Sequence, residues 1–294
     1  MKRVRIGILI HRDDAAFVYF KYLIKLIMKE WRAAGFAVEV IRGVDRFVPA
    51  DMIISHVDLT VVPDEYREFL SQYPLVINRS VRDISKSAIS SHLVGRDDPY
   101  AGPVIVKTDR NSGGFPEARM VGQRHLLRAV AARLTRSGRS GARFQPGAIP
   151  WAEVRHLKSG QYPVFPSLQE VPVDIFDNKH LVIEKFLPEI IDDSYHVRYY
   201  HFLGDREIAE RYQSRNKVVK ASSSIQYEIV TTPPELDQLR KELGLEYGKI
   251  DYVIHAGNLV VLDVNPTPGL PSNAPLARRI ARHLADGITS QLIR

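Results

Sequence analysis

The chain has 294 residues, of which 45% are hydrophobic and 26% charged, an ordinary composition for a globular protein and enough length for two domains. It has no cysteine, so disulfides, zinc thiolates and thiol catalysis are excluded. No apolar run approaches the ~20 residues that span a membrane, and no signal-peptide core follows the basic N-terminus, so we expect a cytoplasmic protein with no membrane partner.

The net charge of +7 comes from one segment. Residues 118–147 contain seven arginines and no acidic residue, and the rest of the chain is balanced. Two interpretations are open: a solvated helix followed by a flexible loop, or a patch for an anionic partner. The segment offers one aromatic residue, Phe144, for base stacking, so nucleic acid is the less favoured partner.

The first third of the chain alternates short apolar runs with helical stretches. Strands are predicted over 4–10, 36–41, 52–54 and 75–78, and a helix from Phe17 to about Ala34. This alternation is typical of a small parallel sheet. Open α/β sheets bind ligands at the carboxyl ends of their strands, where either loop residues or substrate-binding residues can lie. The substrate-site candidates there are His11, Asp13, His56 and Asp58.

The middle of the chain begins with a predicted strand over 103–107 that ends in Lys107. A glycine-bearing loop follows, in which backbone N–H groups can approach phosphate oxygens; its central residues are Ser112, Gly113 and Gly114. A basic helix is predicted from about 117 to 134, and the proline-rich stretch 148–180 predicts short strands and loops. A further strand is predicted over 181–189.

The last third contains a predicted β-hairpin over 248–265 with its turn at Gly257-Asn258. Asp251 begins the first strand, and Asp263 and Asn265 end the second on one face. Pairing then brings three oxygen ligands together, a set that Mg²⁺ prefers when phosphates complete its shell. Around the hairpin we predict strands over 196–203 and 207–212, a basic loop over 214–224, and helices over 235–243 and 275–293.

In this order, the motifs resemble those of the ATP-grasp superfamily of carboxylate–amine ligases. Its members include D-alanine–D-alanine ligase, glutathione synthetase and the ligases that add glutamate to ribosomal protein. The resemblance covers about residues 83–270 and implies an α/β fold of the α+β ATP-grasp type. A small parallel N-terminal α/β substrate domain, 1–85, would be followed by two α+β subdomains, 86–187 and 188–294, that enclose ATP between antiparallel sheets.

The resemblance also implies roles for individual residues. Mg²⁺, or Mn²⁺ in its place, is held by Asp251, Asp263 and Asn265, with Asp263 at a position where the family more often has Glu. Lys107 and Arg198 are the catalytic residues that spread positive charge around the phosphates, and Arg215 is a further substrate candidate. The implied nucleotide-binding residues are Lys86, Lys107, Ser112, Gly113, Gly114, Glu184, Lys185, Phe186, Leu187, Glu189 and Arg211.

Two of these assignments depart from the family pattern or have an alternative. Lys86 lies closer to Lys107 along the chain than the family's first phosphate-binding lysine does. Glu189 is the implied ribose ligand, and Asp192 is the alternative.

The implied activity is ADP-forming ligation. ATP phosphorylates a carboxylate to an acyl-phosphate, and an amine then displaces phosphate to form an amide. The cofactors are ATP and Mg²⁺, the partners are small-molecule or peptide carboxylates and amines, and a homodimer is left open. Two alternatives also stay open: an ATP-grasp-type kinase of a small hydroxyl substrate, and a nucleic-acid-binding module that uses 118–147. The sequence does not name the substrates.

Overall fold

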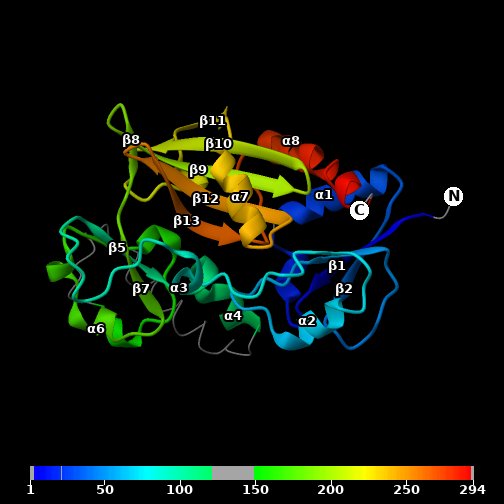
Figure 1. The fold of residues 1–294 in the computed structure, drawn as a ribbon, viewed down its shortest axis with the longest axis horizontal. Helices are drawn as coiled ribbons and strands as arrows, with labels where there is room; N and C mark the ends of the chain where they lie inside the picture. The colour runs from blue at the N-terminus through cyan, green and yellow to red at the C-terminus, as the bar shows by residue number, and fades with distance from the viewer. Residues whose placement is uncertain (1–2, 21, 121–148, 293–294) are drawn as a thin grey trace. The chain divides into compact units, whose positions relative to one another are not determined.

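The computed structural model describes residues 3–20, 22–120 and 149–292. The chain divides into two compact units (Figure 1): unit 1 comprises residues 1–84 and 188–294, and unit 2 comprises residues 85–187. The three-domain division at 1–85, 86–187 and 188–294 stays a prediction. None of the helices within the described ranges is long and apolar enough to cross a membrane.

Unit 1 begins with a four-stranded parallel sheet in the order β2-β1-β3-β4. Its strands are β1 (Arg5–Ile10), β2 (Ala37–Arg42), β3 (Met52–Ser55) and β4 (Val76–Ile77). The central strands β1 and β3 are continuous apolar runs because both faces of a parallel sheet are covered. Helix α1 (Leu23–Ala33) turns an apolar stripe inward, and α2 (Asp64–Leu70) precedes β4.

The helix predicted from Phe17 begins later, at Leu23, so that part of the prediction is wrong. Phe17 lies in a short 3-10 helix, η1 (Ala15–Val18), and Tyr22 is extended. The ammonium of Lys25 donates to three carbonyl oxygens of the intervening segment, those of Phe17, Val18 and Phe20. In a continuous helix these carbonyls would accept backbone N–H groups, so the lysine stabilises the break.

The second part of unit 1 is an antiparallel sheet in the order β11-β10-β9-β12-β13, with β8 also paired to β9. Its strands are β8 (Glu189–Ile191), β9 (Ser194–Leu203), β10 (Arg206–Ser214), β11 (Gln226–Val230), β12 (Tyr247–His255) and β13 (Asn258–Asn265). The other elements are η7 (Ala221–Ser223), α7 (Pro234–Glu242), α8 (Ala274–Ala285) and α9 (Ile288–Leu292). Helix α8 packs on α1, and Trp31 Nε1 donates to the Ala285 carbonyl at 2.9 Å.

Unit 2 is built on a three-stranded antiparallel sheet in the order β6-β5-β7. Its strands are β5 (Val104–Thr108), β6 (Val164–Phe165) and β7 (Leu181–Lys185). Its helices are α3 (Lys86–Ile89), η2 (Asn111–Gly114), α4 (Phe115–Met120), η4 (Trp151–Glu153), η5 (Ser159–Gln161), η6 (Leu168–Glu170) and α6 (Val173–Phe176). Trp151 and Ile183 lie in its hydrophobic core. Parallel and antiparallel sheets with intervening helices confirm the predicted α/β class.

Candidate functional site

The β12–β13 hairpin gathers polar side chains on one face of the antiparallel sheet. Asp251 is paired with Asp263, and Lys249 with Asn265, across the two strands. On its other side, Asp251 is paired with Tyr199 of β9. Side chains that are directly opposite, or two apart on a strand, share a face, so all five lie on what we call the triad face. The structure therefore brings together the predicted triad, Asp251, Asp263 and Asn265.

Lys249 is the charged member of the triad face that was not predicted. Its Nζ lies 2.6 Å from Asp251 Oδ1 and 4.0 Å from the centre of the Tyr199 ring. The side chains of Lys249 and Asp251 are only 17% and 20% exposed. Burial lowers the pKa of Lys249, but Asp251 and Tyr199 outweigh burial and raise it overall, so the ammonium stays charged. The spacing of two residues on a strand was the signal that placed it beside Asp251.

The donor set of the triad fits a divalent cation. Two carboxylates placed directly opposite each other repel, and a cation relieves that repulsion. Burial raises the pKa of Asp251, and Asp263 raises it further while Lys249 opposes the shift. Among the described residues, no group of three or more His, Cys, Asp or Glu side chains could hold a metal ion. The triad differs from such a group because its third donor is the amide of Asn265.

Thr267 connects the triad to the parallel sheet of unit 1. Its backbone N–H donates to Asn265 Oδ1 at 2.8 Å, and its hydroxyl oxygen lies 3.1 Å from that atom and 2.8 Å from Asp58 Oδ1. The hydroxyl has one proton, and we assign it to the nearer and stronger acceptor, the Asp58 carboxylate. Asn265 Oδ1 then keeps a lone pair for a metal ion. The Asp58 carboxylate also accepts the Tyr22 hydroxyl at 2.7 Å.

In unit 2, Lys107 and Glu184 form a buried ion pair. Lys107 Nζ lies 2.6 Å from Glu184 Oε2, and the two side chains are 8% and 5% exposed. The register of β5 against β7 puts both side chains on the same face. Lys86 is also buried, and its backbone N–H donates to the Asp109 carbonyl at 3.0 Å. Unit 2 thus holds a buried ammonium at the end of β5, where the phosphate-binding lysine was expected.

The glycine loop adopts backbone conformations that suit glycine. Ser112, Gly113 and Gly114 have φ angles of 49°, 72° and 74°. A Cβ on Gly113 would lie 2.2 Å from the Leu157 carbonyl oxygen, so close packing alone requires a glycine there. The His156 ring lies against the same loop, with its Nδ1 3.3 Å from the Gly113 oxygen. The glycines therefore have a structural reason independent of any phosphate.

The predicted adenine border, Glu184 to Leu187, follows β7. The N–H of Lys185 donates to the His92 carbonyl at 2.9 Å, and the N–H of Phe186 donates to the Pro103 carbonyl at 2.8 Å. The Lys185 ammonium lies 5.1 Å from the centre of the Tyr100 ring. These two backbone donors are thus engaged within unit 2.

Comparison with known proteins was made by sequence and by structure. No protein-family model matches the chain, and no curated protein matches it. The crystal structure of a RimK domain ATP-grasp protein from Sphaerobacter thermophilus aligns with 97% of this chain and 100% of its own, with a TM-score of 0.50 and 12% identity.

The chain has an ATP-grasp fold. This confirms the fold predicted from the sequence. Two further structures match with lower scores: a D-alanine–D-alanine ligase from Bacillus anthracis (TM-score 0.46, 14% identity, 99% of this chain and 98% of that one) and a D-cycloserine synthetase (TM-score 0.44, 12% identity, 96% and 99%).

In this fold, the predicted Arg198 lies on the face of the sheet opposite the triad. It neighbours Tyr199 on β9, and successive side chains of a strand point to opposite faces. Arg198 Nη2 donates to Glu189 Oε1 at 2.7 Å, and the Ile254 N–H donates to Glu189 Oε2 at 2.8 Å. Arg211 forms its own ion pair with Glu228. The roles predicted for Arg198, Arg211 and Glu189 stay predictions, and these residues form a separate ionic cluster.

The substrate candidates on the parallel sheet differ in exposure. His11 stacks on Tyr66, its Nδ1 accepts the Asp13 N–H at 3.1 Å, and burial lowers its pKa. Asp13 is exposed. His56 is fully buried beside the rings of Phe17, Tyr22 and Tyr247, and burial lowers its pKa to about 4. His56 is therefore a neutral group inside unit 1 at neutral pH.

Of two further predicted features, one lies in a loop and the other mostly outside the described residues. Arg215 follows β10 at an exposed position. Most of the arginine-rich segment 118–147 lies outside the described residues.

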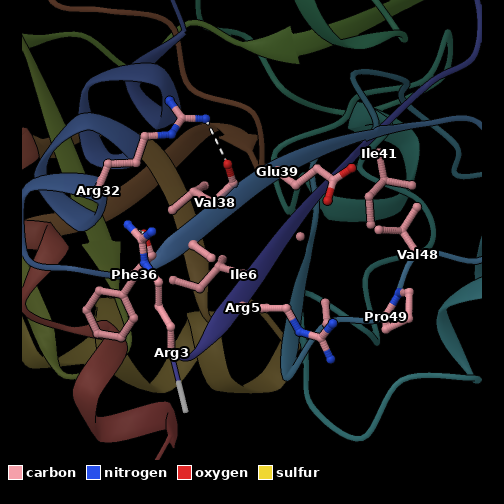
Figure 2. Close-up of a pocket in the computed structure, with 13 residues that line it drawn as sticks. Arg3, Arg5, Ile6, Arg32, Phe36, Val38, Glu39, Ile41, Val48 and Pro49 are labelled. Carbon is pink, nitrogen blue, oxygen red and sulfur yellow. Dashed lines mark hydrogen bonds between the residues drawn. The ribbon is translucent and has the colours of Figure 1, made fainter. Parts of the chain in front are cut away.

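Figure 2 shows a cavity of about 450 Å³ elsewhere in unit 1, lined in part by Arg3, Arg5, Arg32 and Glu39. Arg3 and Arg32 donate to backbone carbonyls there, including that of Val38 at 2.9 Å from Arg32 Nη2. The cavity lies at the amino ends of β1 and β2, whereas open α/β sheets bind ligands at the carboxyl ends. We therefore take the triad, rather than this cavity, as the candidate site.

Proposed function

We propose that the chain is an ATP- and Mg²⁺-dependent, ADP-forming ligase that joins a carboxylate to an amine. The observation that carries this proposal is the triad. The carboxylates of Asp251 and Asp263 face each other, and the Asn265 amide oxygen has a lone pair for a metal ion, all on one sheet face of an ATP-grasp fold. Oxygen donors of this kind suit Mg²⁺ when phosphates complete its coordination. In unit 2, we propose the buried Lys107 as a phosphate-binding residue.

The proposed chemistry requires charge neutralisation and positioning, because no protein nucleophile is needed for phosphoryl transfer. Asp251, Asp263 and Asn265 would hold Mg²⁺, which supplies electrostatic stabilisation of the phosphate oxygens. Thr267 holds the Asn265 amide in place through its backbone N–H. Lys107 presents a fixed positive charge, and Glu184 keeps that ammonium in position. The substrate carboxylate would attack the γ-phosphorus of ATP and release ADP. The acceptor amine would then attack the resulting acyl-phosphate, forming the amide and releasing phosphate and a proton.

The direct test is phosphate release from ATP and Mg²⁺ across a panel of carboxylates, each with and without amines. We expect Asp263→Ala to abolish turnover while its circular dichroism spectrum stays native, because a facing carboxylate of the triad is lost. Asp205→Ala is the matched control, since Asp205 lies in the exposed turn between β9 and β10. Full turnover by Asp263→Ala would show that the triad is not the metal site.

Hydroxylamine separates the ligase from a kinase that acts on a hydroxyl group. A carboxylate substrate that passes through an acyl-phosphate is trapped as a hydroxamate, whereas a phosphorylated hydroxyl is not. Hydroxamate formation that depends on both ATP and the carboxylate is the result expected for the proposed ligase. A stable phosphate ester with no hydroxamate would establish the kinase instead.

A further inference from the structure

We propose that Lys249 makes metal binding by the triad conditional on nucleotide. Its ammonium partly neutralises the Asp251 carboxylate, so without nucleotide the triad binds a divalent ion weakly. Nucleotide phosphates then restore the affinity by bringing negative charge. This inference rests on the proposed function, because it takes the triad to be the metal site.

Distance and charge carry the first step. Lys249 Nζ lies 2.6 Å from Asp251 Oδ1, an oxygen that a metal bound by the triad would share. Asp251 and Asp263 together carry a formal charge of −2, which the ammonium reduces to −1. A divalent ion at the triad would meet this positive charge at close range in a poorly solvated position, where electrostatic effects are large.

The surroundings of Lys249 keep the ammonium in place. The Tyr199 ring lies 4.0 Å away, so the cation is held by the face of an aromatic ring as well as by a carboxylate. The cross-strand neighbour, His201, lies 3.1 Å from Glu210 through its Nε2. The carboxylate to which Lys249 is paired is that of Asp251.

Nucleotide changes this balance. A nucleoside diphosphate brings several negative charges, which attract both the ammonium and a divalent ion. The repulsion between the two cations is then offset by shared phosphate oxygens. Coupling of this kind is reciprocal, so metal must raise nucleotide affinity by the factor by which nucleotide raises metal affinity. Lys249 would thus favour the arrival of metal and nucleotide together.

The test measures Mn²⁺ binding directly, without turnover. Free Mn²⁺ is titrated by its electron paramagnetic resonance signal against the 294-residue chain, with and without saturating ADP, and the Mn²⁺ bound by ADP alone, measured in a protein-free titration, is subtracted. We expect Lys249→Met to tighten Mn²⁺ binding in the absence of ADP by about ten-fold or more. With ADP present we expect a change of less than about three-fold, because phosphate charge already offsets the lysine. Lys249→Arg keeps the charge and should behave like the wild type.

Lys241→Met is the matched control. Lys241 forms an ion pair with Asp237 at the same 2.6 Å distance, but on α7 and with a side chain that is 64% exposed. Its removal should leave Mn²⁺ affinity unchanged. Lys249→Gln provides a second neutral variant should the methionine variant unfold, and thermal unfolding by circular dichroism verifies each protein.

Three results overturn the inference. If the neutral variants bind free Mn²⁺ within two-fold of the wild type while ADP still promotes binding, Lys249 does not control the metal, and the proposed function stands. The same conclusion holds if they lose affinity for Mn²⁺·ADP without any gain for free Mn²⁺, because Lys249 is then a phosphate ligand. If no protein binds Mn²⁺ even with ADP, both the inference and the metal assignment fail.

Discussion

The Lys107–Glu184 pair allows a stability role to be separated from a nucleotide role. Its atoms are 2.6 Å apart, and both side chains are less than a tenth exposed. Removal of the Lys107 ammonium takes this partner from the buried Glu184 carboxylate, and a loss of this kind typically costs about 3–5 kcal/mol. We therefore expect Lys107→Met to lower the unfolding free energy of unit 2 by about that amount. Replacement of both residues, Lys107→Met with Glu184→Leu, should recover most of the loss, because a buried pair and an apolar pair are often of similar stability.

The chain offers a probe for unit 2 alone. It has two tryptophans, Trp31 in unit 1 and Trp151 in unit 2. In a Trp31→Phe background, urea unfolding followed by fluorescence reports on buried Trp151 and hence on unit 2. Lys185→Met is the control, since Lys185 contacts the Tyr100 ring and its removal should cost about 1 kcal/mol or less.

Nucleotide affinity should follow a different pattern from stability. If Lys107 binds phosphate, ATP binding measured by calorimetry stays weaker by about 1.5–3 kcal/mol in the double variant, although the fold is restored. If instead the two single losses of stability simply add in the double variant, the two groups are not coupled, and the energetic reasoning from the ion pair is refuted.

Two more predictions concern groups buried in each unit. The pKa of His56 is lowered from 6.5 to about 4 in the folded chain. Between these two pH values the unfolded chain binds a proton that the folded chain does not, so the unfolding free energy must fall as pH falls from 6.5 toward 4. Between about pH 7.5 and pH 5 the loss should be about 2 kcal/mol, and His56→Phe should abolish it in urea titrations; an unchanged pH slope would contradict a buried neutral imidazole. Gly113→Ala should destabilise unit 2 by more than about 2 kcal/mol, because the added Cβ would clash with the Leu157 carbonyl oxygen. Gly35→Ala, also at positive φ but with open space around it, should cost only about 1 kcal/mol. Equal losses in the two variants would show that packing at Gly113 is not the cause.

The β12–β13 hairpin was predictable because its signals are local. Alternating apolar residues, a Gly-Asn turn and two polar residues spaced by two at the strand end lie within one short stretch. The alternation of side chains along a strand also puts Lys249, two residues before Asp251, on the same face. Whether the two form an ion pair depends on their side-chain conformations, which the sequence pattern does not determine. The ATP-grasp fold was predicted from the resemblance of several such motifs, in their order, to those of the superfamily.

Features that depend on distant contacts were missed. The segment from Phe17 to Tyr22 has a helical pattern, yet Lys25 binds its carbonyls and Tyr22 pairs with Gly269. Strand β11, Gln226–Val230, lies at the sheet edge with mostly exposed side chains, so its apolar alternation gave a weak signal. The ionic cluster of Arg198 and Glu189 depends on which face each strand presents, and that follows from the register with β12.

The packing of α1 against α8 constrains when unit 1 can form. Trp31 donates to the carbonyl of Ala285, and all of unit 2 is synthesised between these two residues. A growing chain therefore emerges with the apolar stripe of α1 uncovered until nearly every later element has left the ribosome. Unit 2, continuous in sequence, has its complete set of contacts much earlier. Long sequence separation slows folding and prolongs the exposure of hydrophobic surface, so unit 2 is expected to complete its contacts before unit 1 does.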